Sequence, residues 1–204
     1  MAQKKVNLLT DCTKVKLSDC ANLNSFDCED ADLNEFFKTD SHFYDSQLLG
    51  KSYSFVLDGK DEHMVCAFTI SNDTLLLENV PKGSRKQVRE GMPDPKKRIK
   101  SYPAVKIGRL GVNSIYGGCG VGSQLLNFLK AWFADSDNKT GCRFLTVDAY
   151  NTEKAISFYK KNDFKFLIPD QKVELDNFNS KRRKAAEELK TRFMYFDLIQ
   201  ITDN

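Results

Sequence analysis

The amino-acid sequence predicts a mixed α/β fold with one central sheet. Three observations predict it: strand-like alternation in the first half of the chain, one strongly amphipathic helix at Ser123 to Ala134, and alternating strand-like and helix-like segments after it. The expected order is two helices, an antiparallel meander, then strand, helix, strand, helix and strand, with a last strand after an insertion. We find no internal repeat in this order.

The first half of the chain predicts two helices and a meander. Apolar residues recur at helical spacing over 33–37 and 43–48, and Gly50 is a natural end for the second helix. Three strand-like segments follow, at 52–57, 65–70 and 74–80. The turn residues of 58–61 join the first two.

The second half contains the clearest helix. Five apolar residues of Ser123 to Ala134 form one stripe: Leu125, Leu126, Leu129, Trp132 and Phe133. The other expected elements are strands at 104–112, 144–149, 164–168 and 192–201, a helix from Asn151 or Thr152 to Asn162, and a basic helix at 179–190. Together with the meander, these segments predict a mixed sheet with crossover helices.

The length predicts one domain. A chain of 204 residues can bury roughly 70% of the surface that its unfolded form exposes, which is enough for one core. We expect a single domain over 1–204, with surface insertions at about 81–103 and 170–190. The first is rich in Gly and Pro around a basic stretch, 84–90, that can form one or two helical turns.

Composition excludes several classes of protein. No apolar run approaches the roughly 20 residues of a membrane-spanning helix, and the start of the chain is too polar for a signal peptide. We therefore expect a cytoplasmic protein that does not enter a membrane. The six cysteines form no CxxC pair and only two histidines are present, so we expect free thiols and no metal site.

The net charge of +3 hides a strong segregation of charges along the chain. Residues 27–45 carry seven acidic side chains against one lysine, whereas Lys82 to Lys100 carries eight basic residues against two acidic ones. Lys181 to Arg192 is a second basic run. Such runs can bind a polyanion by releasing counterions from phosphates. A solvated surface face is the alternative interpretation.

A glycine-rich segment carries the most specific chemical signal. Gly117, Gly118, Gly120 and Gly122 lead directly into the predicted helix. Backbone N–H groups at a helix N-terminus form an anion cradle that can hold a diphosphate. The spacing fits neither the dinucleotide fingerprint GxGxxG nor the Walker loop. A glycine-rich turn without a ligand is the alternative.

The strand before this segment contains two glycines of its own. Gly108 and Gly111 interrupt the strand at 104–112, where glycine commonly marks a bulge or the close approach of a ligand to the backbone. An extended ligand with amide groups, such as a pantetheine arm, suits such a strand.

These residues lead to a resemblance. The segments RLGV, GGCGVG and VDAYNTEKAISFYKKNDF, within Val105 to Ile168, resemble the acetyl-CoA binding core of the GNAT N-acetyltransferase superfamily. The resemblance implies a mostly antiparallel central sheet with helices on both faces and a V-shaped splay between the two central strands. It also implies acetyl-CoA as co-substrate and no metal.

The resemblance implies roles for individual residues. The cofactor-binding set that it implies is Leu110, Gly111, Val112, Gly117, Gly118, Cys119, Gly120, Val121, Gly122, Ser123 and Asn151. In this set the strand holds the pantetheine arm and the glycine loop holds the diphosphate. Tyr159 is implied to protonate the departing CoA thiolate, and a packed core aromatic is the alternative for it.

This sequence departs from the family pattern at three positions. Gly117 replaces the usual Gln or Arg, Cys119 replaces a frequent basic residue, and Asp163 replaces a glycine. Main-chain contacts to the diphosphate do not depend on the first two side chains. Asp163 can adopt the left-handed helix end that glycine usually provides.

A narrower similarity concerns the acceptor. FDCEDADLNEFF, KSYSFVL, IGRLGV and VDAY resemble the subgroup that contains the acetyltransferase toxins of toxin–antitoxin pairs, which block the α-amine of aminoacyl-tRNA. Glu78 and Asp148 are the nearest sequence candidates for a general base. An α-amine of pKa about 7.7 to 8.0 needs less help from a base than a lysine amine of about 10.4.

We therefore expect an acetyl-CoA dependent N-acetyltransferase that acts on a primary amine, with aminoacyl-tRNA as the leading acceptor and the two basic runs as its contact. A small-molecule amine or a protein amine is the alternative acceptor, because residues 27–45 can attract a polycation. A noncatalytic acyl-CoA binding module is the alternative from another class. A homodimer and a paired antitoxin are expectations of the resemblance only.

Overall fold

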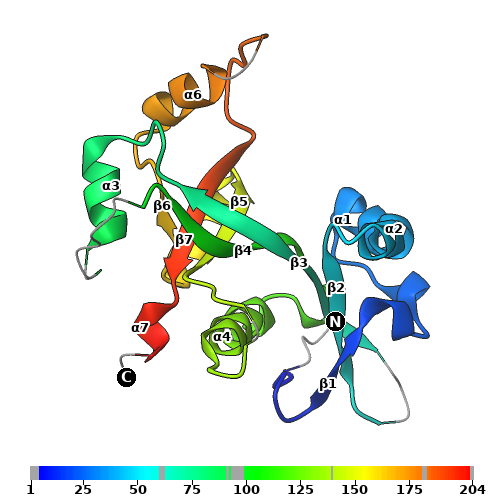
Figure 1. Cartoon of the computed structure of the whole chain (residues 1–204). Helices are drawn as coiled ribbons and strands as arrows, with labels where there is room; N and C mark the ends of the chain where they lie inside the picture. The colour runs from blue at the N-terminus through cyan, green and yellow to red at the C-terminus, as the bar shows by residue number, and fades with distance from the viewer. Residues whose placement is uncertain are drawn as a thin grey trace. The chain divides into compact units, whose positions relative to one another are not determined.

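The computed structural model describes residues 5–59, 63–90, 92, 99–138, 140–180 and 183–202 (Figure 1). The strands are β1 Cys12–Lys16, β2 Lys51–Leu57, β3 Met64–Leu76, β4 Ser101–Val112, β5 Phe144–Tyr150, β6 Lys165–Phe166 and β7 Thr191–Asp197. The helices are α1 Ala31–Glu35, α2 Ser41–Ser46, α3 Lys82–Arg89, α4 Val121–Ala134, α5 Glu153–Lys161, α6 Gln171–Asn179 and α7 Ile199–Thr202. A π-helical turn, Phe36–Asp40, joins α1 to α2.

The seven strands follow the order β1-β2-β3-β4-β5-β7-β6. The pairs β1–β2, β2–β3, β5–β7 and β6–β7 are antiparallel. The chain divides into two compact units. Unit 1 comprises residues 1–72 and 106–138, and unit 2 comprises residues 73–105 and 139–204, so β3 and β4 each contribute to both units. The predicted mixed α/β fold with a mostly antiparallel sheet is confirmed.

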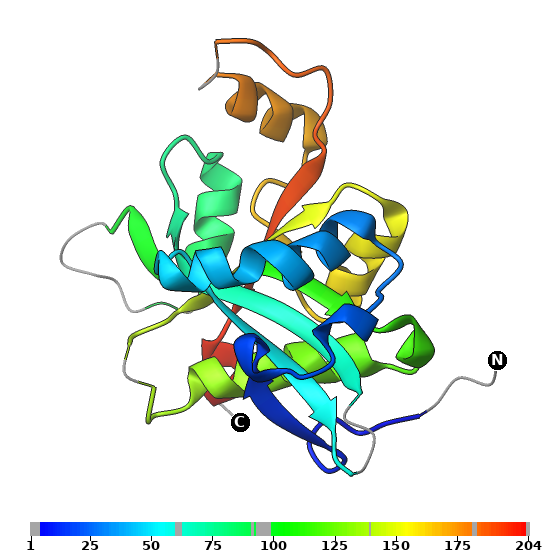
Figure 2. The same cartoon turned by 90° about the vertical axis from the view of Figure 1, so that its right-hand side faces the viewer.

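Unit 1 buries aromatic side chains on both faces of its strands. On one face, Phe55 of β2 lies 5.0 Å from the Phe128 ring of α4, and Tyr53 lies 5.4 Å from Trp132. The opposite face packs Phe36 and Phe37, in a cluster that includes Phe26, Met64 and Ala67. This division follows from the two-residue period of a strand. Figures 1 and 2 show α4 on one side of these strands and α1 with α2 on the other.

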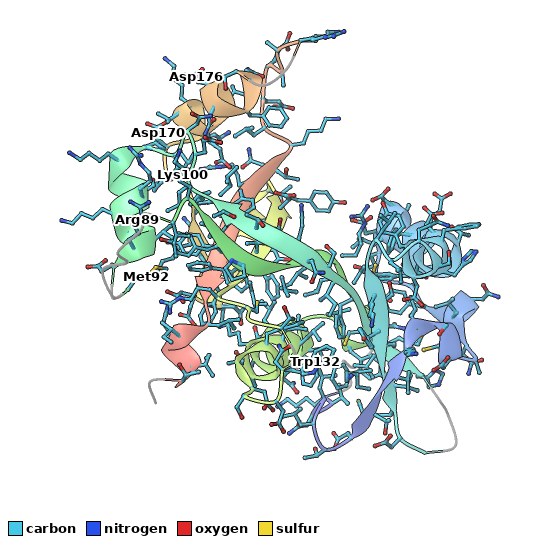
Figure 3. All side chains as sticks on the ribbon, viewed as in Figure 1. Arg89, Met92, Lys100, Trp132, Asp170 and Asp176 are labelled. Carbon is cyan, nitrogen blue, oxygen red and sulfur yellow. The ribbon has the colours of Figure 1, made fainter. Side chains whose placement is uncertain are left out.

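Unit 2 has a core of its own. Phe144 of β5 packs between Tyr102 of β4, at 5.9 Å, and Tyr195 of β7, at 5.6 Å. Helix α3 adds Val88 to this cluster, while its charged residues stay outside it. Met92, labelled in Figure 3 beside Arg89, packs against the same cluster. The basic stretch in 84–90, predicted to form one or two helical turns, is thus part of an eight-residue helix.

Several elements agree with the sequence predictions. Helix α4, the strands β2 and β5, and the start of α5 at a threonine cap lie within about two residues of their predicted positions. Asp163 has the expected left-handed conformation, with φ of 65°. Phe164 N–H donates to the carbonyl of Tyr159 at 3.0 Å, which closes the end of α5. An aspartate therefore replaces the family glycine without loss of the helix cap.

Four sequence predictions are wrong. The strands expected at 65–70 and 74–80 are one strand, β3, because Ser71 to Asp73 stay extended instead of turning: half-buried and exposed residues alternate from Ser71 to Thr74, after the fully buried run of Met64 to Thr69. The basic helix expected at 179–190 is absent: α6 begins at Gln171 and ends at Asn179, and the described residues 183–190 are not helical. Strand β6 covers two residues only, and β7 ends at Asp197, before α7. Strand β1 was not predicted.

Local capping explains the position of α6. The Asp170 carboxylate accepts hydrogen bonds from the N–H groups of Lys172 at 2.9 Å and Val173 at 3.1 Å. An aspartate in this position satisfies N–H groups that have no partner within the helix. At the other end, the Asn179 amide group exchanges two hydrogen bonds with the backbone of Ala186. These bonds hold a loop where the sequence predicted a helix.

None of the helices in the described part of the chain has the length and the apolar run needed to cross a bilayer. All six cysteines are free, as predicted. Within the described residues, no group of three or more His, Cys, Asp or Glu side chains is arranged to hold a metal ion.

Candidate functional site

The glycine-rich segment lies entirely in unit 1. A short 3₁₀ turn, Ser114–Tyr116, follows β4, and the Asn113 side chain caps it by accepting from Ile115 N–H at 3.2 Å. Gly118 and Gly120 then have φ of 71° and 83°. An L-residue pays roughly 1 to 2 kcal/mol for this left-handed conformation, so the glycines allow a turn that leads straight into α4.

The N-terminus of α4 has the properties of an anion site. Its N-cap, Gly120, provides no side-chain hydrogen bond to the first turn. A Cβ atom added at Gly120 would meet no other atom within 4 Å, so the space beside the turn is open. The first N–H groups of a helix have no partner within the helix, and the helix dipole favours negative charge there. A diphosphate fits this arrangement.

Residues Val6 and Leu8, near the N-terminus, support the start of α4. This contact was not predicted from the sequence. The Gln124 side chain accepts from Leu8 N–H at 2.9 Å and donates to the carbonyl of Val6 at 3.1 Å. Leu8 is fully buried. These two bonds fix the first turn of the helix against residues more than a hundred positions away, and no local pattern in the sequence indicates such a contact.

Two hydrogen bonds join the residue after β4, Asn113, to β3. Asn113 N–H donates to the Val65 carbonyl at 3.0 Å, and its side-chain amide donates to the Met64 carbonyl at 3.1 Å. Leu110 and Val112 are half-buried, and Gly111 is buried. Their predicted contact with a pantetheine arm stays a prediction.

The two strand glycines differ in their surroundings. A Cβ at Gly111 would lie 3.1 Å from the Cys28 sulfur and 3.2 Å from a Phe37 ring carbon. Gly111 therefore has a packing reason to be glycine, independent of any ligand. A Cβ at Gly108 would approach only the Thr69 carbonyl, at 3.8 Å, so no crowding by the protein explains that glycine.

Tyr159 lies on α5, in unit 2. It is buried, with an exposed fraction of 8%, and its ring contacts Phe158 at 5.0 Å and Phe164 at 5.4 Å. Burial raises the pKa of the Tyr159 phenol, because the apolar surroundings disfavour the phenolate. The phenol is therefore protonated at neutral pH, as a proton donor must be.

Asn151 has contacts within unit 2. Its N–H donates to the Lys190 carbonyl and its side-chain amide donates to the Leu189 carbonyl, both at 2.9 Å. Asn151 thus anchors the end of the loop that precedes β7. Its predicted contact with the cofactor stays a prediction beside this structural role.

The structure brings the two general-base candidates together. Glu78, in the turn after β3, and Asp148, on β5, both line one cavity of about 890 Å³ in unit 2. The sequence separates these residues by seventy positions, and only the pairing of the sheet places them beside the same space. Segment 184–190 and α6 complete the walls of the cavity.

The basic runs differ in their surroundings. On α3, Lys82, Arg85 and Lys86 are exposed while Ser84 and Val88 are buried, so the helix presents a basic face. Arg89 donates to the carbonyl of Ile99 at 3.0 Å. The lysines and arginine at 96–98, and the basic residues at 181 and 182, lie outside the described residues.

Arg192 does not belong to an exposed basic run. It is 5% exposed and forms an ion pair with Glu174 of α6. The prediction that the whole run Lys181 to Arg192 is an exposed contact for a polyanion is therefore wrong at its last residue. A buried guanidinium needs partners for its donors, and Arg192 finds them in its own unit.

Comparison with known proteins agrees with this fold. Residues 90–166 match the family model described as an acetyltransferase (GNAT) domain. Among solved structures, a Tyr-to-Phe mutant of KacT matches with a TM-score of 0.69 at 17% identity, over 95% of this chain and 99% of that chain. AtaT complexed with acetyl-methionyl-tRNAfMet matches with a TM-score of 0.69 at 21% identity, over 94% and 98%. AtaTR bound with AcCoA matches with a TM-score of 0.66 at 21% identity, over 94% and 96%.

Residues 90–166 therefore match a GNAT acetyltransferase domain, and acetyl transfer is the class of reaction that this domain defines. Its fold is that of the toxin acetyltransferases of toxin–antitoxin pairs. The predicted family, fold and class of enzyme are confirmed. Acetyl-CoA as co-substrate agrees with the class, and the α4 N-terminus has the chemistry to hold its diphosphate.

Proposed function

We propose that this acetyltransferase transfers an acetyl group from acetyl-CoA to the α-amine of an aminoacyl-tRNA. The observation that carries the donor half of the proposal is the open glycine turn before α4, with a helix N-terminus that no side chain caps. The turn lies within the segment that matches the GNAT domain.

The residues have distinct roles in the proposed reaction. Within the segment from Gly117 to Ser123, the N–H groups of Gly117 and Cys119 donate to carbonyls of the preceding turn, so the other N–H groups hold the diphosphate. The backbone of Leu110, Gly111 and Val112 holds the pantetheine arm. The neutral amine attacks the thioester carbon, a C–N bond forms and the C–S bond breaks. Tyr159 gives its proton to the departing thiolate, and its phenolate then takes a proton back from water. The proton that the amine loses goes to water, directly or through Glu78 or Asp148.

The basic face of α3 supports a nucleic-acid acceptor. Lys82, Arg85 and Lys86 are exposed on one helix. Contacts of this kind bind phosphates without regard to sequence and weaken as salt rises. The solved complex of AtaT with acetyl-methionyl-tRNAfMet, a protein of the same fold, supports the same class of acceptor.

An acidic face favours a second candidate acceptor. The exposed acidic residues are Glu29 before α1, Asp32 and Glu35 on α1, Asp40 in the π-helical turn and Asp45 on α2. This face attracts cations, so a polyamine or a basic protein is the competing acceptor.

One experiment separates these acceptors. Radiolabelled acetyl-CoA is incubated with the enzyme and a fractionated cell extract, and the label is followed in RNA, protein and small-molecule fractions. We expect the label in RNA, and we expect it to be released when the aminoacyl ester is hydrolysed with mild base. Label confined to protein or metabolites contradicts the tRNA proposal, and no transfer to any fraction contradicts the enzymatic one.

A charge reversal tests the contact with RNA. Arg85→Glu together with Lys86→Glu removes positive charge from the exposed face of α3, and we expect weaker tRNA binding with a smaller dependence on salt. Lys16→Glu together with Lys51→Glu, at exposed lysines of β1 and β2, changes the net charge by the same amount and is the control. Equal salt dependence in both proteins contradicts a role for α3.

Two predicted protein partners, a second copy of the chain and an antitoxin, need separate tests. The solved structures of similar fold include AtaT with the C-terminus of the antitoxin AtaR and a KacTA–DNA complex. We propose a homodimer and an antitoxin partner for this chain because its sequence resembles the acetyltransferase toxins of toxin–antitoxin pairs. Light scattering of the purified protein at several concentrations tests the dimer, and co-expression with the adjacent gene tests the antitoxin.

A further inference from the structure

The cavity of unit 2 has the size of a ligand site. Its volume of about 890 Å³ lies in the range of roughly 300 to 1,000 Å³ that small-molecule sites occupy. Its lining comes from the end of β3, from β5 and β7, and from α6 with the loop at 184–190. Four separate stretches of chain therefore contribute to one space.

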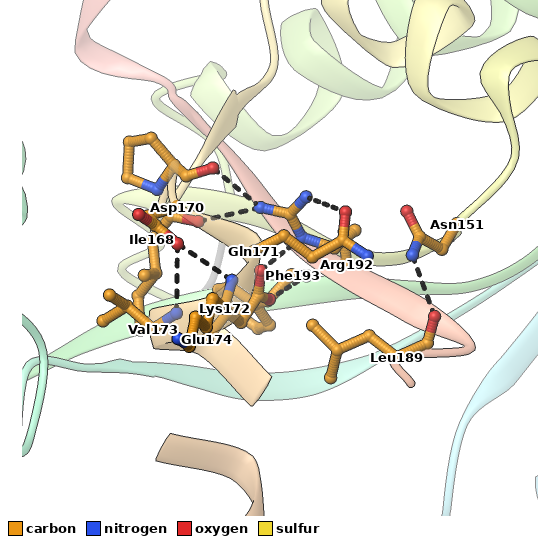
Figure 4. Close-up of polar contacts among 11 residues, drawn as sticks. Asn151, Ile168, Asp170, Gln171, Lys172, Val173, Glu174, Leu189, Arg192 and Phe193 are labelled. Atoms are coloured by element: carbon orange, nitrogen blue, oxygen red, sulfur yellow. Dashed lines mark hydrogen bonds and ion pairs between the residues drawn. The ribbon is translucent and has the colours of Figure 1, made fainter. Parts of the chain in front are cut away.

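The wall made by α6 is held in place by a buried arginine. Figure 4 shows Arg192 in contact with Glu174, and its guanidinium also donates to the carbonyls of Ile168 and Pro169, each at 3.0 Å. The second Glu174 oxygen accepts from Phe193 N–H at 3.0 Å. The helix cannot leave β7 without exposing a buried ion pair, so the cavity is formed before any ligand arrives.

Three amide side chains fix the rest of the wall. Asn151 donates to the Leu189 carbonyl, as Figure 4 also shows, and Asn179 bonds the backbone of Ala186. Asn177 donates to the carbonyl of Asn79, in the turn after β3, at 3.1 Å. The loop at 184–190 and the turn after β3 are thus both tied to fixed elements.

The lining is mainly apolar, and part of its apolar surface is uncovered. Leu167, Ile168 and Leu189 are buried in it, whereas Leu76 of β3 and Phe178 of α6 are each 41% exposed. Large apolar side chains that remain accessible inside a concave surface are typical of a site that an apolar group covers.

The charged groups of the lining define what can enter. Glu78, Asp148 and Glu188 are exposed acidic residues, and Lys184 and Lys190 are exposed basic ones. Glu174, a fourth acid of the lining, forms an ion pair with Arg192. An excess of carboxylates repels phosphate and attracts an amine, so the cavity does not suit the phosphate backbone of a nucleic acid.

We propose that this cavity binds the aminoacyl group of the acceptor and selects a large apolar amino acid. The apolar side chain covers Leu76 and Phe178, and the α-amine lies toward Glu78 and Asp148. The proposal rests on the proposed function, because it assigns the substrate class of the same reaction. The cavity proposal goes beyond the proposed function, because the basic face of α3 can bind any tRNA and does not distinguish the amino acid that the tRNA carries.

The test compares acceptors that differ only in the amino acid. One tRNA is charged in turn with glycine, alanine, leucine and phenylalanine, and the rate of acetylation is measured for each at equal concentration. We expect kcat/KM for leucyl-tRNA to exceed that for glycyl-tRNA by at least about tenfold, because one or two methylene groups in an apolar pocket already give 10- to 200-fold discrimination.

Two variants test whether the cavity causes the preference. Leu76→Ser and Phe178→Ser place a hydroxyl in the apolar lining, and we expect each to reduce the leucyl-to-glycyl ratio by about tenfold. Val173→Ser is the matched control, because Val173 is 39% exposed on the same helix and does not line the cavity. The control is expected to keep the ratio of the unchanged protein.

A second pair of variants tests the acidic side of the cavity. Glu78→Gln is expected to raise KM for leucyl-tRNA several-fold, whereas Asp176→Asn is expected to leave it unchanged. Asp176 is exposed on α6, outside the lining, and Figure 3 labels it there.

The outcomes separate this inference from the proposed function. Acetylation of glycyl- and leucyl-tRNA at equal rates overturns the cavity proposal and leaves the acetyltransferase proposal standing. The same holds if Leu76→Ser changes the preference between acetyl-CoA and octanoyl-CoA instead of that between amino acids, since the cavity then binds the acyl chain. If no charged tRNA is acetylated, the proposed function fails. Calorimetry with leucinamide and glycinamide then tests whether the cavity binds a large apolar amino acid. Tighter binding of leucinamide supports the inference, and equal or absent binding overturns it.

Discussion

Unit 1 and unit 2 offer different chemistry to the reaction. In unit 1 the candidate groups belong to the backbone: glycine residues with positive φ leave the N–H groups at the start of α4 open. In unit 2 they are side chains: the phenol of Tyr159, the carboxylates of Glu78 and Asp148, and the apolar lining of the cavity. A backbone site suits a co-substrate that is the same in every turnover. A side-chain site can differ between enzymes with different acceptors.

The largest effect that distinguishes the two units is expected at Tyr159. Tyr159→Phe keeps the packing of the ring against Phe158 and Phe164 but removes the proton donor. We expect kcat to fall by roughly 10² to 10⁴, the usual contribution of general acid–base catalysis, with little change in the dissociation constant of acetyl-CoA. Steady-state kinetics together with calorimetry measure both quantities.

Replacement of a neighbouring aromatic residue serves as the control for this prediction. Phe158→Leu changes the packing around the phenol and keeps the hydroxyl. If Tyr159→Phe lowers kcat no more than Phe158→Leu does, the tyrosine is a packed aromatic and unit 2 has no proton donor at this position.

The sequence predicted features that depend on neighbouring residues and missed those that depend on contacts between distant residues. The glycine segment, helix α4 and the Thr152 cap of α5 are patterns within a few residues, and each was found where it was expected. The buried face of α4 differs in part from the predicted stripe, since Lys130 is buried while Trp132 and Phe133 are half-buried. The cavity was not predictable, because Leu76, Asp148 and Phe178 meet only through the pairing of strands that lie far apart in the sequence. The sequence did indicate Glu78 and Asp148 as carboxylates, but not that they share a space.

The basic segment after α6 shows how a composition signal can mislead. Its lysines and arginines are good helix formers, which favoured a helix at 179–190. The cap at Asp170 and the pair between Asn179 and Ala186 place the helix earlier and leave the basic residues in a loop. Two short polar contacts outweigh helix propensities that differ by only a few tenths of a kcal/mol per residue.

The next largest effect concerns stability and is expected in unit 2. Arg192→Leu leaves Glu174 buried without its cation and removes the bonds to Ile168 and Pro169. Breaking a buried pair by removing one partner costs about 3 to 5 kcal/mol, and we expect the free energy of unfolding to fall by this order. Denaturation in urea measures it, with the exposed Arg183→Leu as the control. A loss below about 1 kcal/mol means that α6 is not held by this pair.

The acceptor amine sets the expected pH dependence. Because only the neutral amine attacks, kcat/KM should rise with pH and level off above the amine pKa, at about 7.7 to 8.0 for an α-amine and about 10.4 for a lysine amine. The pKa of Tyr159 is raised by burial, so its proton is retained through this range and no loss of activity is expected below pH of about 10. A rate that still rises at pH 9.5 contradicts an α-amine acceptor.

The smallest expected effect is on stability and concerns Lys14 in unit 1. The ammonium group of Lys14 lies 4.2 Å from the Trp132 ring centre and 4.7 Å from that of Tyr53. Cation–π contacts of a partly exposed lysine contribute about 0.5 to 1 kcal/mol, so Lys14→Met should lower the free energy of unfolding by this amount. Acetyl-CoA binding and kcat should not change, since this contact serves only the packing of unit 1. A change in acetyl-CoA affinity contradicts that division.

The binding of acetyl-CoA by the glycine turn is the central claim, and calorimetry of two matched glycine variants tests it most directly. Gly120→Ala and Gly59→Ala both place a Cβ at a positive φ, of 83° and 124°, with no atom within 4 Å, and only Gly120 precedes α4. We predict that the unchanged protein and Gly59→Ala bind acetyl-CoA alike, and that Gly120→Ala binds it at least about tenfold more weakly. Equal heats of binding for all three proteins, or no heat for any of them, would contradict the account.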